Sequence, residues 1–312
     1  MKEWKLWILA LVLGWMVPYT AAVLVLGGGT VVEKTAPSIT DPVIQPKEAV
    51  WITVVDGEKT RTMDLEEYLV GVLLGEIPGS FHIEAKKAQA VVARTYTLRT
   101  IAENGKHPGA VCTDSGCCQA YCDPASVDED TSLEVRLAVR ATAGQVLTYE
   151  GALIEATYFS CSGGYTEDAV AVWGSDVPYL QAVPSPGEEM ATHYTDTVTF
   201  QPEELAIALG QKLSGSPDRW FGAVTYTQGG GVDTIRIGQR EYTGKALRAL
   251  LGLRSTAFTV EVHDEQIRFV TRGFGHRVGM SQYGAQAMAL AGSNYQQILA
   301  HYYTDTQLAE YP

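Results

Sequence analysis

Glu76 is the residue of this chain that is best placed for acid–base chemistry. It follows an apolar stretch with helical spacing, and Gly75 and Pro78 bracket the end of that stretch. The carboxyl end of a helix carries partial negative charge and an apolar setting disfavours ionisation, so both would raise the pKa of this carboxyl. A carboxyl that keeps its proton near neutral pH can act as a general acid toward a leaving oxygen. From position alone, a solvated residue at a helix end remains the alternative.

A second group of reactive side chains lies in one loop rich in Gly and Asp. Four of the chain's five cysteines fall there beside a histidine, and the set is His107, Cys112, Cys117, Cys118 and Cys122. Zinc binds four such nitrogen and sulfur ligands tetrahedrally. Disulfides and free thiols are the alternatives, and disulfides require an oxidising compartment.

Two further segments combine small polar side chains with glycines. The first offers hydroxyls and close backbone approach through Ser160, Ser162, Gly163, Gly164 and Thr166. The second is a Gly-rich loop that carries His276 and continues into Ser281, Gln282 and Tyr283. A tight turn and an ordinary loop histidine are the alternatives from the residues alone. Neither segment has the glycine spacing of a dinucleotide-binding loop or of a nucleophile elbow.

These segments alternate with predicted helices and strands. Residues 51–55, 145–149 and 153–159 have strand character, and helical spacing covers residues 83–99, 132–143 and 202–213. Asp64 with Glu67, and Ser293 with Gln296, have the spacing of capping boxes at helix starts. We therefore expect an α+β fold, with mixed helices and short antiparallel strands in two subdomains around a groove.

Composition narrows the functional class. The 312 residues are 46% hydrophobic and 19% charged, which is typical of a globular chain, and the net charge is −13. Such an acidic chain lacks the basic surface that nucleic acid requires, so no nucleic-acid partner is expected. Five cysteines in this length do not form a disulfide framework.

The amino terminus predicts a membrane anchor. Residues 6–26 contain no charged side chain and would span about 31 Å as a helix, enough for a bilayer core. Residues 1–5 carry two lysines and are expected to form a cytoplasmic tail. Residues 27–47 read as an extracytoplasmic linker rich in Gly and Pro, and residues 48–312 as the folded domain outside the cell membrane. Cleavage of the anchor as a signal peptide remains open.

Several motifs resemble the stage II sporulation protein D family. They occur in the family's order, within residues 48–312: LEEYLVGV at 65–72, GEIP at 75–78, AKKAQAVVARTY at 85–96, FSCSGGYT at 159–166, YL at 179–180 and GFGHRVGMSQYGA at 273–285. Members of this family are typically single-pass membrane proteins that face outward, which agrees with the predicted anchor.

The resemblance implies a lytic transglycosylase of peptidoglycan. Such an enzyme cuts the β-1,4 bond between N-acetylmuramic acid and N-acetylglucosamine and leaves a 1,6-anhydro end. The family's catalytic acid falls on Glu76. A sugar substrate needs small polar donors and aromatic platforms, so the two polar segments, together with Tyr179, become candidate substrate contacts. The family acts on strands already stripped of stem peptides, in the engulfing membrane of the mother cell, and its usual partner is a cell-wall amidase of the stage II sporulation protein P type.

The resemblance also concerns the Cys–His loop and two positions, 117 and 277, at which this chain differs from the usual family residue. The Cys–His loop is similar to the zinc loop of clostridial members, in which His107, Cys112 and Cys118 would be ligands of a structural zinc that the chemistry does not require. Position 117 is often His there, so the fourth ligand stays open between Cys117 and Cys122. The family more often has Gly at position 277, and Arg277 could instead contact an acidic substituent of the glycan.

A function of another class also fits the sequence. The chain could be a non-catalytic glycan-binding scaffold that activates the amidase, as related amidase enhancers are thought to do. The sequence separates neither these two functions nor a sporulation role from a vegetative one.

Overall fold

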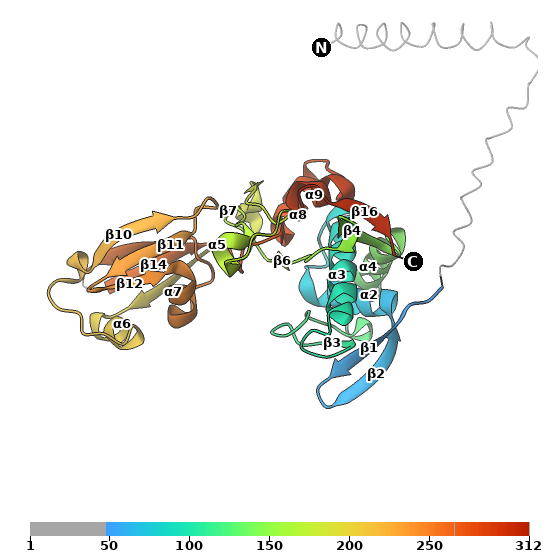
Figure 1. The fold of residues 1–312 in the computed structure, drawn as a ribbon, viewed down its shortest axis with the longest axis horizontal. Helices are drawn as coiled ribbons and strands as arrows, with labels where there is room; N and C mark the ends of the chain where they lie inside the picture. Colours follow the sequence, from blue (N-terminus) through green and yellow to red (C-terminus); the bar gives the residue numbers. More distant parts are fainter. Residues whose placement is uncertain (1–47, 265, 312) are drawn as a thin grey trace, which may run out of the picture. The chain divides into compact units, whose positions relative to one another are not determined.

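The computed structural model describes residues 48–264 and 266–311, and these form a mixed helix and strand fold with two hydrophobic cores (Figure 1). The first core is built from residues at both ends of this range, and the second from residues 198–269 between them. The chain therefore leaves the first core, builds the second and returns.

The first core surrounds α3 (Ile83–Ala102), which packs against α2 (Leu65–Glu76), α4 (Glu129–Ala141), α8 (Gln282–Leu290) and α9 (Tyr295–Tyr302). The middle of α3 is buried because Ala and Val there let the neighbouring helices approach closely. Arg94 at its centre is fully buried, and its guanidinium donates to both carboxylate oxygens of Glu66 on α2, at 2.8 and 2.6 Å. This bidentate pair fixes the two helices against each other.

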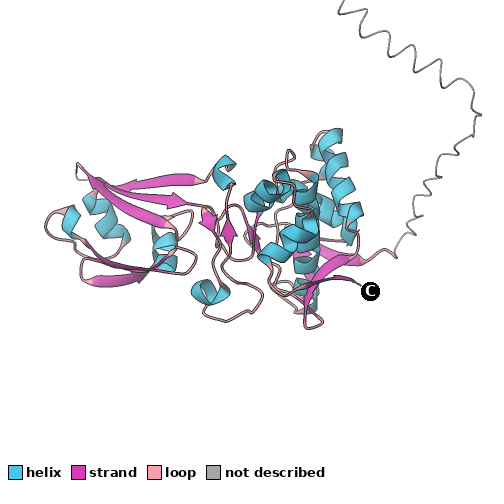
Figure 2. Ribbon diagram, turned by 90° about the horizontal axis from the view of Figure 1, so that it is seen from above, coloured by secondary structure: helices cyan, strands magenta, loops and turns pink. Residues whose placement is uncertain are grey.

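Short strands surround these helices (Figure 2). In one three-stranded sheet, β1 (Trp51–Asp56) pairs antiparallel with β2 (Lys59–Asp64) and parallel with β3 (Ala110–Cys112). A second sheet has the order β16 (Gln307–Glu310), β4 (Gln145–Tyr149), β5 (Ala152–Leu153). Two-stranded pairs join distant segments, and they are β6 (Tyr158–Phe159) with β15 (Met280–Ser281) and β7 (Gly164–Tyr165) with β8 (Pro184–Ser185).

The second core lies between two three-stranded antiparallel sheets and their helices (Figure 1). The sheets are formed by β10 (Phe221–Tyr226), β11 (Val232–Ile237) and β12 (Arg240–Thr243), and by β13 (Phe258–His263), β14 (Gln266–Arg272) and β9 (Thr195–Phe200). The helices are α6 (Pro202–Ala208) and α7 (Gly244–Leu251), and α5 (Ala169–Trp173) precedes this part of the chain. Phe269 is fully buried at the centre and contacts the rings of Phe200, Phe221 and Phe258.

Several element boundaries differ from the sequence prediction. The helix predicted over residues 132–143 is α4, over Glu129–Ala141, and the strand predicted over 153–159 is divided into β5 and β6. The helix predicted over residues 202–213 ends at Ala208, because Gly210 turns the chain with a left-handed φ of 58°. The capping box at α9 uses Asn294 and Gln297, one residue later than predicted. Asn caps as well as Ser, and the next amide, that of Tyr295, is already bound by Glu84 of α3 at 2.8 Å.

The predicted fold is corrected in one element. No helix within residues 48–264 and 266–311 is both long and apolar enough to cross a bilayer. The longest of them, α3, fails because Lys and Arg side chains interrupt it. The predicted spanning helix, residues 6–26, lies outside the described residues, as do the predicted tail and linker, so the fold that the structure supports is the mixed helix and strand fold alone.

Candidate active site in the groove at Glu76

Glu76 is the last residue of α2 and lies in the wall of a cavity of about 680 Å³. Asp64 caps the start of the helix, since its carboxylate accepts from the Glu67 amide at 3.2 Å, and the helix ends where Ile77 returns to extended backbone. A cavity of this size matches ligand-binding sites. The first requirement for a catalytic role, access to a substrate, is therefore met.

The Cys-rich loop crosses the end of α2 because two glycines make room for it. A Cβ on Gly71 would collide with the Tyr121 ring, and one on Gly75 would lie 2.8 Å from the backbone of Ala120 and Tyr121. The Cys122 amide donates to the Gly71 carbonyl at 2.9 Å. The crossing brings the Ala120 amide to Glu76 Oε1, at 2.7 Å.

Another part of the groove lining comes from β6, which pairs in parallel with β15, and from the start of α8. Ser281 caps α8 by accepting from the Gly284 amide at 3.1 Å, which places Gln282 in the first turn. Gln282 Nε2 approaches Glu76 Oε2 at 3.5 Å. Tyr158 from β6 lines the cavity and donates to Gln119 Oε1 at 3.0 Å. Segments from three distant parts of the chain thus surround one carboxyl.

Glu76 has neutral hydrogen-bond donors and no ion pair with a described residue. Burial raises the pKa of its carboxyl, and hydrogen bonds from Ala120, Tyr158 and Gln282 oppose that rise. The cause expected from the sequence, an apolar setting, is thus present as burial. The site can hold a protonated carboxyl acid against a bound substrate and can stabilise the carboxylate once the proton has left.

The predicted substrate contacts divide into two groups. Ser160, His276 and Gln282 line the cavity with Glu76. The others lie away from its lining, and they are Ser162, Gly163, Gly164, Thr166, Tyr179, Ser281 and Tyr283. Tyr283 packs edge-on against Phe81, and the Tyr179 hydroxyl accepts from the Arg99 guanidinium at 3.2 Å and from the backbone amide of the groove residue Glu155 at 2.9 Å.

The Ser162–Gly163 turn points inward because a buried carboxylate holds it. Glu188 Oε2 accepts from the Ser162 amide at 2.6 Å, the Ser162 hydroxyl at 2.9 Å and the Gly163 amide at 2.9 Å. Both Ser162 and Glu188 are fully buried. This turn shapes the structure behind the groove.

His276 is a neutral groove residue. Burial and the nearby Arg248 cation lower its pKa to about 4, and its Nδ1 accepts from the Val278 amide at 3.2 Å. Nδ1 therefore has no proton, and Nε2 carries the single N–H.

Arg277 does not contact the groove, which corrects the expectation that it could meet a glycan substituent. Its side chain is 1% exposed and pairs with Glu167 at 2.9 Å, with further bonds to the carbonyls of Ser162, Tyr165 and Gly229. A buried guanidinium needs such partners, and they turn it inward.

The Cys–His loop brings four possible ligands together. The donor atoms of His107, Cys112, Cys117 and Cys118 all lie within 4.8 Å of one another. Ligand atoms of a tetrahedral zinc with thiolates lie about 3.8 Å apart, so this set fits such an ion. Cys122 lies elsewhere, with Sγ 3.3 Å from Ser126 Oγ. All five cysteines are free thiols in the structure.

Sequence reasoning missed several groove residues. Tyr96, Glu155, Tyr158 and Phe274 line the cavity, and the Ala120 amide binds Glu76. Gly71 and Gly75, four residues apart on one helix face, were the available signal for the loop crossing. Glu155 is a second carboxylate of the lining and lies 3.5 Å from the Arg99 guanidinium.

Comparison with known proteins identifies related chains. Residues 56–149 match the family described as Stage II sporulation protein. The chain is 40% identical over 264 residues to stage II sporulation protein D of Bacillus subtilis (strain 168), covering 81% of this chain and 76% of that protein. The corresponding protein of Bacillus amyloliquefaciens is 38% identical over 261 residues, with 80% and 75% covered. The amidase enhancer of Bacillus subtilis (strain 168) is 30% identical over 301 residues, covering 78% of this chain and 40% of that protein.

Proposed function

Because this chain belongs to the stage II sporulation protein D family, a family of sporulation, we propose that it is a peptidoglycan lytic transglycosylase. In this proposal it cleaves the bond between N-acetylmuramic acid and N-acetylglucosamine in strands without stem peptides, during engulfment of the forespore. Peptidoglycan lies outside the cytoplasmic membrane, so the folded part would act there.

The observation that carries the proposal is the Glu76 carboxyl. It lies in the wall of a cavity large enough for a sugar, its pKa is raised by burial, and neutral groups surround it. A general acid must hold its proton until a leaving oxygen needs it, and such surroundings provide that.

The proposed reaction needs one acid and no water. Glu76 donates its proton to the glycosidic oxygen as the bond from that oxygen to C1 of N-acetylmuramic acid breaks. The 6-hydroxyl of the same sugar attacks C1, and its proton goes to the Glu76 carboxylate. The products are a free 4-hydroxyl and a 1,6-anhydro ring, with Glu76 protonated again. The attacking hydroxyl is tethered to the reacting carbon, so no second residue need activate water.

Glu155 is the residue that hydrolysis, the alternative chemistry, would require as a second carboxyl group. Glycoside hydrolases use two carboxyl groups at the scissile bond, and Glu155 lines the same cavity as Glu76. Its ion pair with Arg99 and its 42% side-chain exposure suit a solvated charge at the rim. We therefore assign it no role in the bond cleavage.

Zinc is the metal that we propose for the Cys–His loop, with His107, Cys112, Cys117 and Cys118 as ligands. Four protein ligands would close the coordination shell, so the ion would be structural. Its contribution would be to fix the loop that carries the Ala120 amide to Glu76. Metal analysis of the purified chain should then find one zinc per molecule.

The test is to incubate the full chain with peptide-free glycan strands and to weigh the products. We expect 1,6-anhydro ends, which are lighter than hydrolysed ends by one water. Glu76→Gln should abolish them while glycan binding persists. Glu67→Gln, on the exposed first turn of the same helix, is the control and should keep activity. Hydrolysed ends, or undiminished activity of Glu76→Gln, would overturn the proposal.

A second candidate function follows from the relative named amidase enhancer. In it, the chain binds glycan and activates a cell-wall amidase, such as one of the stage II sporulation protein P type, without cutting glycan itself. Amidase stimulation would then survive Glu76→Gln unchanged, and no 1,6-anhydro ends would form with the unaltered chain.

A further inference from the structure

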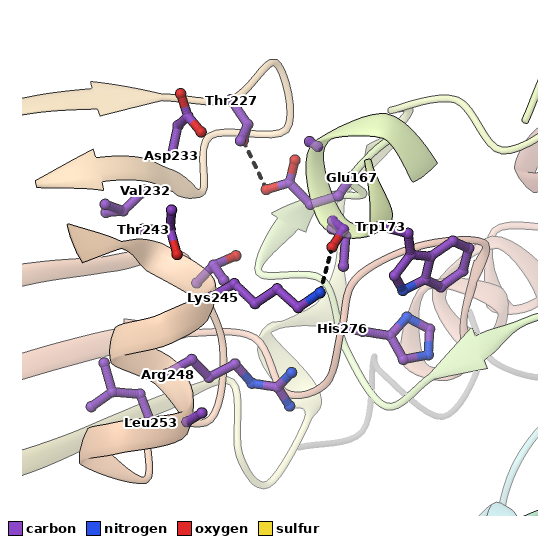
Figure 3. A pocket seen from close by; sticks show the side chains of 14 residues that line it. Glu167, Trp173, Thr227, Val232, Asp233, Thr243, Lys245, Arg248, Leu253 and His276 are labelled. Carbon is purple, nitrogen blue, oxygen red and sulfur yellow. Dashed lines mark hydrogen bonds between the residues drawn. The ribbon is translucent and has the colours of Figure 1, made fainter. Parts of the chain in front are cut away.

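A second cavity, of about 530 Å³, shares the His276 side chain with the groove at Glu76. Its walls come from α5, from β11 and from α7 (Figure 3). The Arg248 guanidinium and the Lys245 ammonium both extend from α7 toward the His276 side (Figure 3). Any ligand that passes His276 from the groove reaches these two cations.

Neither cation has an acidic partner among the ion pairs recorded within residues 48–264 and 266–311. Arg248 Nε donates to the Arg254 carbonyl at 3.2 Å, and Lys245 Nζ donates to the Val172 carbonyl at 3.0 Å. Arg248 is half-buried, and this burial lowers its pKa. A half-buried guanidinium with no opposite charge is costly, and an anionic ligand would relieve that cost.

The carboxylates of this cavity do not neutralise the two cations. Glu167 is paired with the buried Arg277, and its Oε1 also accepts from the Thr227 hydroxyl at 2.9 Å. Asp233 is exposed and accepts from the Thr225 hydroxyl at 3.3 Å. Because the Glu167–Arg277 pair is neutral, the two cations outnumber the one remaining carboxylate of the lining, Asp233, and the cavity carries net positive charge on a chain whose net charge is −13.

One other feature of the cavity suits a sugar. The Trp173 side chain is 38% exposed and its ring lies 5.9 Å from the His276 ring, which makes an aromatic surface at the border with the groove.

We propose that this cavity binds a sugar bearing a free carboxylate, with Arg248 as the main contact and Lys245 as the second. The inference rests on the proposed function, under which the substrate alternates neutral sugars with muramic acid. Muramic acid carries a lactyl carboxylate only when its stem peptide is absent, because the peptide converts that carboxylate to an amide. Recognition here would let the protein distinguish peptide-free strands from intact ones at a sugar next to the cleaved bond.

The experiment compares three substrates with the full chain. They are peptide-free glycan, the same glycan with its carboxylates converted to neutral methylamides, and peptide-bearing glycan. A charge-assisted pair at a half-buried guanidinium corresponds to roughly tenfold in affinity. We expect Arg248→Met to raise the KM and the dissociation constant for peptide-free glycan about tenfold and to leave those for the methylamide unchanged. Arg248→Lys should restore part of the affinity, and Lys245→Met should have a smaller effect of the same kind.

Arg268→Met is the matched control, because Arg268 is exposed on β14 and does not line this cavity. It should leave both substrates unaffected. The inference is overturned if Arg248→Met weakens free and amidated glycan equally, or weakens neither. It is also overturned if Arg248→Met weakens the peptide-bearing strand as much as the peptide-free one, since the recognised carboxylate would then belong to a peptide. The dissociation constant tests this inference independently of the proposed function. Even if the chain never cuts glycan, its affinity for peptide-free glycan can be compared with and without Arg248.

Discussion

Two carboxyls, the partly buried Glu76 in the groove and the fully buried Glu167 at the second cavity, differ in the charge placed beside them. Glu76 receives the Ala120 amide at 2.7 Å and the Gln282 amide at 3.5 Å, both neutral. Glu167 receives the Arg277 guanidinium at 2.9 Å, together with the Gly231 amide at 3.1 Å. Burial without a cation favours the protonated acid, whereas burial with one balances the charge of the carboxylate. The comparison shows that the two carboxyls differ in neighbouring charge as well as in depth, and that the one without a cation is the one suited to chemistry.

The largest expected effect comes from giving Glu76 the cation that Glu167 has. In Gln282→Lys, an ammonium near Glu76 Oε2 would stabilise the carboxylate and lower the pKa of Glu76. Because the unprotonated acid cannot protonate the leaving oxygen, glycan cleavage at neutral pH should fall by about a hundredfold or more. The rate should partly recover at lower pH, where Glu76 is protonated again.

The control for this change is Gln282→Met, which removes a donor and adds no charge. Without the hydrogen bond from Gln282, the pKa of Glu76 should rise, and the alkaline limb of the pH–rate profile should move to higher pH. Gln282→Lys should move it to lower pH. Equal losses in both variants, with unmoved pH profiles, would show that Gln282 acts on substrate and leaves the proton on Glu76 unaffected.

The next effect comes from taking the cation away from Glu167. Arg277→Met leaves a fully buried carboxylate unpaired, which should destabilise the fold by about 3–5 kcal/mol. Denaturant unfolding of the full chain measures this loss. Adding Glu167→Gln removes the unpaired charge, so the double variant should recover much of the stability. A double variant no more stable than Arg277→Met would assign the loss to the carbonyl contacts of Arg277 instead.

The smallest effect concerns stability and pH at Glu76 itself. Burial raises the pKa of Glu76 in the folded chain. At pH values above its pKa in the unfolded chain and below its pKa in the folded chain, the folded chain therefore holds one more proton than the unfolded chain. Stability due to this group is thus highest below the unfolded pKa and falls as pH rises through the folded one. Glu76→Gln removes that loss and should raise Tm on the order of 2 °C at neutral pH, with little change in acid. A fall in Tm at neutral pH would contradict the raised pKa.

Local patterns predicted most of the elements that hold the groove. The apolar spacing of α2, its Asp64 cap and the Gly75–Pro78 ending placed Glu76 at a helix terminus, and the structure has the helix over Leu65–Glu76. The strand predicted over residues 145–149 also formed, as β4. These features depend on residues within one or two turns of each other, so the sequence expresses them directly.

Local sequence patterns could not predict the contacts between distant segments. Ser162 looked like a groove hydroxyl, but Glu188, 26 positions later, turns it inward. Nothing local to Arg277 indicates that Glu167, 110 positions earlier, would bury it. Cys117 and Cys122 were equivalent candidates by type, and the fold brings only Cys117 to the side of His107, at 3.4 Å.

The sequence by itself determined most of the helices and several strands, the family motifs, and the identity of the carboxyl and the loop that could do chemistry. Tertiary structure alone decided the surroundings of each: neutral donors at Glu76, a guanidinium at Glu167, and, beside His276, two cations without acidic partners in the part of the chain that the structure describes. The physical reason is that a side chain's protonation and accessibility depend on the burial and charge that distant segments supply. Those segments become neighbours only when the chain has folded.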